Sequence, residues 1–332
     1  MLGDLWNGLT AGLAKRWVRT VLAPAVVFWG VGLLLWAVDH GWEEAWRQVD
    51  AQVRGRPVPE QVALAVGVLL VVAGSGTAVE RLTTPAVQLL EGYHWPVRLF
   101  DWRSRRHNSR VAAMERTWAE LAAGLSGRGA AEQNRFILVD QRLRRYPDAP
   151  EHRMPTVLGN SLRAAEARPW HKYGLDPVKC WYAFWSVLPD NARTELAAAR
   201  TRVDLAGTVW LWALLFAGWS AWNWWALPLS LAGMSLAYGW LVTYARQYGD
   251  LVEATFDVHR WALYAALHWP PPLTPETERE EGTRLTAYLW RGSHDPHPRF
   301  VDHSRAVSVA QEPPAEARRG TLWEKLGLLR RK

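Results

Sequence analysis

One uncharged apolar run constrains this chain more than any other feature. Residues 205–245 contain no Asp, Glu, Lys, Arg or His. Because an α-helix rises 1.5 Å per residue, about 20 residues cross the hydrocarbon core of a bilayer. The run therefore fits two membrane-spanning helices, over 205–222 and 225–245, with a break at the Trp-rich stretch 222–228. An uncharged run of this length disfavours the alternative, a pair of buried helices in a large soluble protein.

Two more apolar runs lie near the N-terminus, over residues 18–38 and 62–79. The first carries only Arg19, at its edge, and the second is uncharged and rich in small residues. A signal peptide is the alternative for the first run. That run is longer than the apolar region of a signal peptide, however, and no small-x-small cleavage motif precedes Asp39. We therefore predict four membrane-spanning helices in all.

Basic residues mark the same side of all four predicted spans. The connection 39–61 is acidic on balance, with five Asp or Glu against three Arg. Since cytoplasmic flanks carry an excess of Lys and Arg, both termini, 1–17 and 246–332, are predicted to be cytoplasmic. The predicted fold is an all-α polytopic membrane protein, with two hairpins on either side of a helical cytosolic domain, residues 80–204. The flanking basic residues include Lys15, Arg16, Arg19, Arg81, Arg98, Arg103, Arg105, Arg106, Arg110, Arg193, Arg200, Arg202 and Arg246.

Composition narrows the setting and the partners. The chain is rich in Ala, Arg, Gly and Trp but has one Ile and five Lys, which is typical of a GC-rich bacterial genome. A net charge of +7 is compatible with nucleic acid, anionic lipid or the cytoplasmic bias of a membrane protein. Because the basic residues flank the spans, we favour the last and expect no nucleic-acid partner. The predicted location is the bacterial inner membrane.

Helical spacing of apolar residues continues outside the spans, at 82–93, 110–124, 130–146 and 246–292. A helix that starts near Pro189 is predicted to run unbroken into the third span. The sequence shows neither an alternating β pattern nor an internal repeat. Residues 293–332 hold little apolar content, which is typical of disorder, and they end in a short basic amphipathic segment.

The stretch 154–181, between the two predicted hairpins, gathers residue types that binding sites use. One hypothesis is a face that binds a ligand or a cytosolic protein. The other is a packing element, in which polar side chains cap and bridge helices while Gly159 and Gly174 occupy close-contact or turn positions. Pro169 is predicted to end the first helix of this stretch. The candidate residues are Asn160, Arg163, Glu166, Tyr173 and Asp176.

Other reactive residue types lack a supporting pattern. The single Cys excludes an intramolecular disulfide or a Cys-based zinc site, and Cys180, among aromatic residues, is predicted to be a small core residue. Three His and two Asp between 294 and 303 match no defined zinc spacing. The sequence also lacks phosphate-loop, dinucleotide-binding and nucleophile-elbow motifs. We therefore predict no catalytic, metal-binding or cofactor-binding residue.

The spans themselves favour association over transport chemistry. Their interiors carry no ionisable residue, whereas proton- and ion-coupled transporters place such groups near the midplane. Pairs of small residues four apart, such as Ala63 with Gly67, suit helix packing within one chain or in a homo-oligomer. The leading hypothesis is a membrane scaffold or signalling component that docks a cytosolic partner. The alternatives are an oligomeric channel or membrane-perturbing effector and, third, a membrane-bound enzyme of unknown type.

A sequence element in the cytosolic domain resembles one found in other membrane proteins. The stretch "PTVLGNSLRAAE", residues 155–166, is followed by "YGLD" at 173–176 and a Trp-rich helix up to Pro189. This pattern is similar to an uncharacterised family of bacterial multi-span membrane proteins of actinobacterial type. The resemblance covers roughly a quarter of the chain and implies a membrane location, but it implies no activity. Bestrophin-type channels share the general layout, but their motifs are absent.

Overall fold

The computed structural model describes residues 21–124, 129–293, 295 and 298–301. Throughout these ranges the chain is helical or irregular and contains no strand, which confirms the all-α prediction. The predicted N-terminal segment 1–17 and the basic amphipathic end of the tail lie outside the described residues. The chain divides into two units. The first comprises Met1–Ala165 and Thr194–Val252, and the second comprises Glu166–Arg193 and Glu253–Lys332.

Four of the described helices are long and apolar enough to cross a membrane, as predicted. They are α2 (Ala23–His40), α4 (Val58–Glu91), α9 (Asp190–Phe216), which a 3₁₀ turn at Ala217–Ala221 extends, and α10 (Ala226–Ala266). In their most apolar windows only 11 to 33% of the residues are buried. A core helix of a soluble protein would bury its apolar residues, so this exposure fits a lipid environment.

In the first unit, α2, α4 and α9 share a small apolar core. Ala25, Val79 and Leu211 are buried there beside Trp212, and the ring of Phe28 lies 4.9 Å from that of Trp212. Thr83 of α4 and Thr208 of α9 form a hydrogen bond of 3.1 Å. Small side chains and hydroxyl groups of this kind let helices approach closely in lipid.

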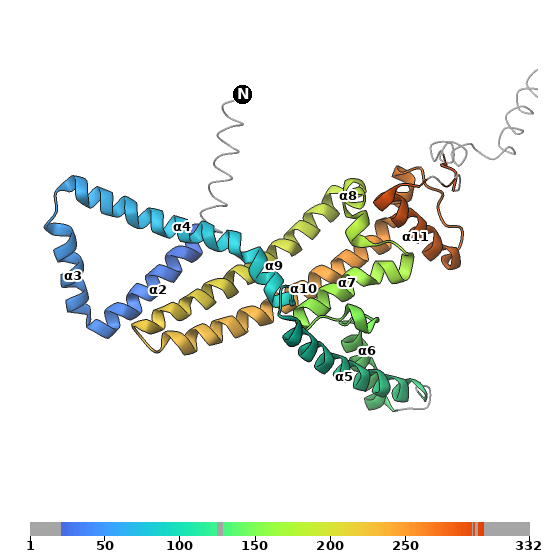
Figure 1. Ribbon diagram of the computed structural model, residues 1–332, viewed down its shortest axis with the longest axis horizontal. Helices are drawn as coiled ribbons and strands as arrows, with labels where there is room; N and C mark the ends of the chain where they lie inside the picture. The colour runs from blue at the N-terminus through green and yellow to red at the C-terminus, as the bar shows by residue number, and fades with distance from the viewer. Residues whose placement is uncertain (1–20, 125–128, 294, 296–297, 302–332) are drawn as a thin grey trace, which may run out of the picture. The chain divides into compact units, whose positions relative to one another are not determined.

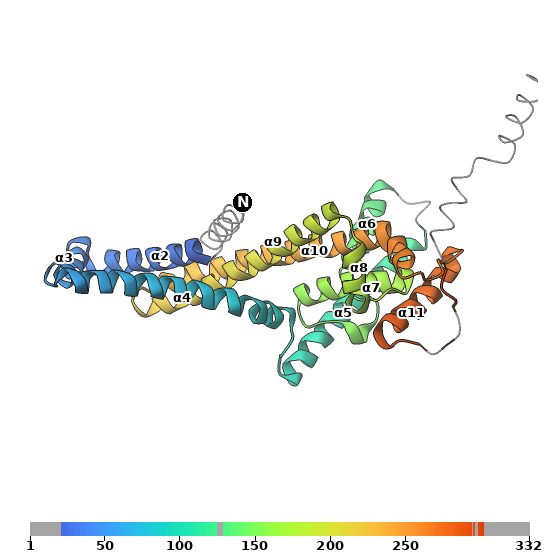
Figure 2. The same cartoon turned by 90° about the horizontal axis from the view of Figure 1, so that it is seen from above.

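Helices α9 and α10 run antiparallel and side by side in the first unit (Figure 1 and Figure 2). The Ser230 hydroxyl of α10 donates a 2.7 Å hydrogen bond to the Ala213 carbonyl of α9. As predicted, α9 runs without a break from Asp190 into the third apolar run. Helix α10 likewise continues past the fourth apolar run, to Ala266.

The connection between the first two apolar runs contains a helix that the sequence analysis did not predict. After Gly41, whose φ is 84°, the chain forms α3 (Trp42–Arg54). Val21, just before α2, lies against Gly76 of α4. From their crossing, α2 and α4 separate toward α3 (Figure 1).

The remainder of the first unit packs around those ends of the long helices that are predicted to face the cytosol. Val87 of α4, Leu158 of α7 (Val157–Tyr173), Val203 of α9 and Leu241 of α10 meet in one buried cluster. Two further helices, α5 (Val97–Ala122) and α6 (Ala130–Leu143), pack on each other. Helix α5 begins thirteen residues before the predicted position 110, directly after Pro96, because its Arg-rich first turns lack the apolar periodicity that would reveal a helix.

The second unit is built around α8 (Pro177–Val187), α11 (Pro275–Arg291) and the adjoining parts of α7 and α10. Phe184 of α8 is fully buried and stacks on Phe256 of α10, with ring centroids 4.0 Å apart. The prediction that Pro169 ends a helix is wrong, because α7 continues through it to Tyr173. A proline inside a helix removes one backbone hydrogen bond but need not end the helix where surrounding packing holds it.

Candidate functional site

The start of α7 is fastened by the polar residues of the "PTVLGN" element. The Thr156 hydroxyl accepts from the Gly159 amide at 3.0 Å and donates to the carbonyl of Glu91, the last residue of α4, at 2.9 Å. The Asn160 side chain is fully buried. It accepts from the Met154 amide at 2.8 Å and donates to the carbonyls of Met154 and Thr156 at 2.6 and 2.7 Å. Asn160 therefore fixes the loop that precedes α7.

Gly159 permits this arrangement because the chain passes too close for a side chain. A Cβ atom at Gly159 would overlap the Glu91 carbonyl and would lie 2.8 Å from the Cβ of Met154. The predicted close-contact role of this glycine is confirmed. Any larger residue would push α7 away from the end of α4.

A cavity of about 510 Å³ opens beside this fastened loop. Its wall comes from the turn between α4 and α5, from the loop before α7, and from Arg163, one helical turn beyond Asn160. The Arg163 guanidinium lies 5.8 Å from the ring centroid of Tyr93, a cation–π contact. The lining residues are Gly92, Tyr93, His94, Trp95, Phe100, Glu151, His152, Arg153, Met154 and Arg163.

The charges around the cavity are unequal. Two arginines, Arg153 and Arg163, line the wall together with one acidic residue, Glu151, and two imidazole rings, those of His94 and His152. Arg153 is nearly fully buried and forms a 2.8 Å ion pair with Glu115 outside the wall. It also donates to the carbonyls of Pro147 and Asp148. Arg153 is therefore held in place by partners of its own, and Arg163 is the second arginine of the wall.

The later candidates lie in the second unit. Asp176 caps the start of α8, where its carboxylate accepts from the amides of Val178 and Lys179. Gly174 has a φ of 68°, and a Cβ atom there would lie 2.7 Å from the Thr283 amide nitrogen, which confirms the predicted turn and close-contact position. The Tyr173 hydroxyl donates a 2.6 Å hydrogen bond to Asp257 of α10.

A buried ion network joins α7 to α10 in this unit. Glu253, only 5% exposed, accepts from Arg168 at 2.7 Å and from Lys172 at 2.6 Å. Burial alone would raise the pKa of Glu253, but the ion pairs with Lys172 and Arg168 outweigh burial, and its pKa is lowered. Burial would lower the pKa of Lys172, but Glu253 and Asp257 raise it.

The same network extends to α11. Arg260 of α10 forms a 2.6 Å ion pair with Glu278 of α11, and its guanidinium lies 4.3 Å from the ring centroid of Tyr173. Burial and the hydrogen bond to Asp257 raise the pKa of Tyr173 to about 12. Three cations thus meet three carboxylates, so the formal charges of the network balance. The network comprises Arg168, Lys172, Tyr173, Glu253, Asp257, Arg260 and Glu278.

Two further kinds of candidate site can be checked in the described residues, the single cysteine and possible metal ligands. Cys180 is fully buried beside Thr286, and burial raises the pKa of its thiol, so it matches the predicted core residue and lacks thiolate character. Within the described ranges, no group of three His, Cys, Asp or Glu side chains could hold a metal ion. Most of the predicted His and Asp cluster at 294–303 lies outside the described residues.

The five predicted residues are divided between the two units, although four of them lie on the continuous helix α7. Asn160 and Arg163 belong to the first unit, and Glu166, Tyr173 and Asp176 belong to the second. The partner face therefore stays a prediction, in which Arg163 is the member that lines a cavity. Sequence reasoning missed Arg153, His94 and His152, because nothing in the linear spacing connects residues 92–100 with 151–154. It also missed Glu253, because the helical pattern of α10 was recognised from its apolar positions, and these do not indicate that one carboxylate among them is buried.

Comparison of the chain with protein-family models, with curated proteins and with solved structures finds no match. The fold alone therefore defines the class. The chain is a helical, membrane-embedded protein with four helices long and apolar enough to span a bilayer. The similarity of "PTVLGNSLRAAE" to a bacterial membrane protein family stays a prediction.

Proposed function

We propose that the chain is an integral protein of the bacterial inner membrane that docks a cytosolic protein partner. In this proposal two hairpins lie in the membrane, and both termini and residues 80–204 face the cytoplasm. The distribution of Arg and Lys around the apolar runs supports this orientation. The small-residue positions of the spans suit association between copies, so the scaffold is a homo-oligomer.

One observation carries the docking role, namely the basic, aromatic cavity around Arg163. The partner inserts an acidic group, an Asp or Glu side chain or a C-terminal carboxylate, between Arg163 and the two His residues of the wall. Arg, Tyr and Trp dominate the binding energy of protein interfaces, and all three residue types line this cavity. Asn160 acts as a positioning residue, because it fixes the loop that carries His152 and Arg153.

The test is photo-crosslinking at His152 in cells, followed by binding of the captured protein in purified form. Arg163→Glu is expected to weaken that binding at least about tenfold, because a lost charge-assisted hydrogen bond costs roughly 1.5–3 kcal/mol. Arg116→Glu is the matched control, since Arg116 is an exposed arginine of α5 outside the cavity. The Arg116→Glu variant should bind the captured protein with the same affinity as the wild type.

Gel filtration of the same variants distinguishes a cavity that docks the partner from a cavity that only holds the fold together. If Arg163→Glu elutes like the wild type but loses the partner, the cavity is the docking site. Equal binding by Arg163→Glu and wild type would refute the proposal. So would crosslinking at His152 no stronger than at Arg116. Ion flux through the purified protein in liposomes would instead support the channel alternative.

A further inference from the structure

Helix α3 has the residue distribution of a helix that lies in a membrane interface. Its large apolar side chains follow one stripe at helical spacing, whereas its charged residues occupy the other face. Trp42, Trp46 and Val49 on that stripe are 65, 64 and 50% exposed. Side chains of this size gain by leaving water, and Trp prefers the boundary between headgroups and acyl chains.

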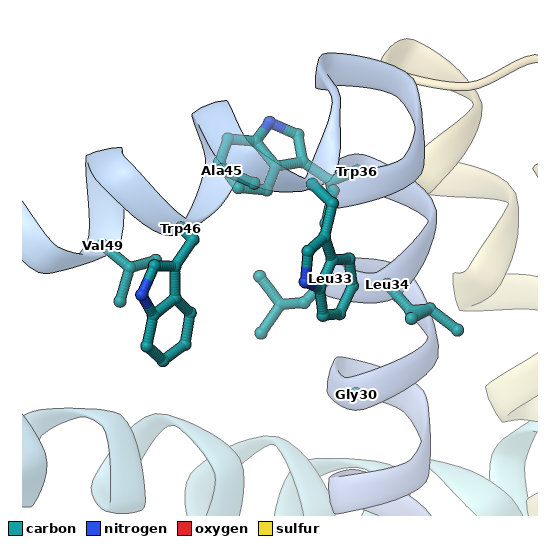
Figure 3. A pocket seen from close by; sticks show the side chains of 9 residues that line it. Gly30, Leu33, Leu34, Trp36, Ala45, Trp46 and Val49 are labelled. Carbon is teal, nitrogen blue, oxygen red and sulfur yellow. The ribbon is translucent and has the colours of Figure 1, made fainter.

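The apolar stripe of α3 faces α2 across an open groove. The groove has a volume of about 360 Å³ and is lined by nine apolar residues of these two helices. Figure 3 shows Leu33 of α2 and Trp46 of α3 pointing toward one another across this space. At its base lies Gly30, and a Cβ atom there would meet nothing within 4 Å. The groove is therefore open space in the described part of the chain.

The position of the groove indicates what fills it. Helix α2 is apolar enough to span a bilayer, and its Val27, Leu34 and Val38 are exposed along its length. The groove is continuous with this exposed apolar surface. Acyl chains therefore reach it without crossing any polar barrier.

The charged residues of α3 do not select lipids with an anionic headgroup. Arg47 pairs with Glu44 at 2.6 Å, and Arg54 pairs with Asp50 at 2.5 Å, both within the helix. These arginines are neutralised in place, so they provide no excess positive charge for an anionic headgroup.

We propose that one acyl chain of a phospholipid occupies the groove between α2 and α3, with α3 lying in the plane of the headgroups. Binding depends on apolar contact alone and is the same for zwitterionic and anionic lipids. This site is independent of the docking cavity around Arg163, because it is built from other residues and takes another class of ligand.

The test uses the full chain in nanodiscs that contain phosphatidylcholine or phosphatidylglycerol with a photoreactive acyl chain. Mass spectrometry should find labelling of α3, at Trp46 and Val49, with both lipids. Gly30→Leu fills the groove and should abolish this labelling. The control Gly218→Leu should leave it unchanged, because a Cβ atom at Gly218, in the 3₁₀ turn after α9, also meets nothing within 4 Å and Gly218 lies outside the groove.

Several outcomes would overturn the proposal. They are unchanged labelling in Gly30→Leu, labelling by phosphatidylglycerol alone, or disulfide-linked dimers of Trp46→Cys in membranes, which would place a second copy in the groove. Should Gly30→Leu fail to fold, Val49→Phe narrows the groove from α3 and should give the same loss.

Discussion

Two regions of the molecule differ in what they expose. Helices α2 and α4 expose apolar side chains, whereas the ion network of the second unit buries a charged one. On α4, Leu70 is 67% exposed, and between residues 62 and 79 no residue is charged. In the second unit Glu253 is 5% exposed, yet it is charged and paired. This difference is expected if, as proposed, lipid surrounds α2 and α4 and water surrounds the second unit. Lipid accepts bare apolar surface, whereas water lets a fold bury ions only when they are neutralised.

The largest expected effect comes from removing an aromatic side chain in each region. Phe184→Ala should lower the free energy of unfolding of the second unit by about 3–5 kcal/mol, because Phe184 is fully buried against Phe256. Phe28→Ala in α2 should cost only about 1 kcal/mol, because lipid is as apolar as the packed helix and leaves only van der Waals contacts to lose. Denaturant unfolding of both variants in detergent measures the difference, and equal losses would contradict the two-solvent interpretation.

A charge placed on equally exposed sites should sharpen the contrast. Leu70 and Val258 are both 67% exposed, the former on α4 and the latter on the part of α10 in the second unit. Leu70→Arg should oppose membrane insertion by about 2.5–3.5 kcal/mol, the usual penalty for Arg near the centre of a span. Val258→Arg should change stability by less than about 0.5 kcal/mol, as expected for a surface in water. An insertion assay for the first variant and thermal unfolding for the second measure these effects, and similar behaviour of the two would place both surfaces in one solvent.

A smaller effect is expected when the buried carboxylate of the network is neutralised. Glu253→Gln leaves Arg168 and Lys172 without their acceptor charge. One-sided loss of a buried pair costs about 3–5 kcal/mol, and the partial exposure of Lys172 reduces this to roughly 2 kcal/mol. Glu280→Gln is the control, because Glu280 forms an exposed pair with Arg284 on α11 and should cost less than about 1 kcal/mol. A loss at Glu253 no larger than that at Glu280 would show that the network is solvated.

These contrasts also explain which parts of the fold the sequence predicted. The four apolar runs were predictable because lipid demands about 20 uncharged residues in each span, a signal that is local in the chain. Helix α3 carries its signal too, in the spacing of Trp42, Ala45, Trp46 and Val49, but thirteen residues of mixed charge resemble an ordinary polar loop.

The candidate site was predictable only in part. Asn160 and Asp176 form hydrogen bonds with backbone groups that are close to them in the sequence. Their positions next to turns indicate this role. The cavity around Arg163 and the ion network depend on pairs such as Arg153 with Glu115 and Arg168 with Glu253, which are 38 and 85 residues apart. Contacts over such distances are set by tertiary packing, which a single sequence does not specify.

The smallest expected effect is a pH dependence carried by Glu253. Its pKa is lowered in the folded state, so it binds protons more weakly there than in the unfolded chain, whose pKa is the ordinary 4.5. The stability that it contributes is therefore present above pH 4.5 and lost as the pH falls through the lowered pKa. Lys172, with a raised pKa, contributes stability that is present below its ordinary value of 10.5 and lost only at higher pH.

The difference in stability between wild type and Glu253→Gln should consequently be constant from about pH 5 to pH 9 and shrink in acid. Denaturant unfolding at pH 7, 5 and 3.5 checks this, with Glu280→Gln as a reference in which the difference stays small throughout. If the gap between wild type and Glu253→Gln instead widened in acid, Glu253 would have to be protonated in the folded state. The carboxylate would then be buried as a neutral acid, and the contrast between paired ions in water and uncharged spans in lipid would lose its clearest example.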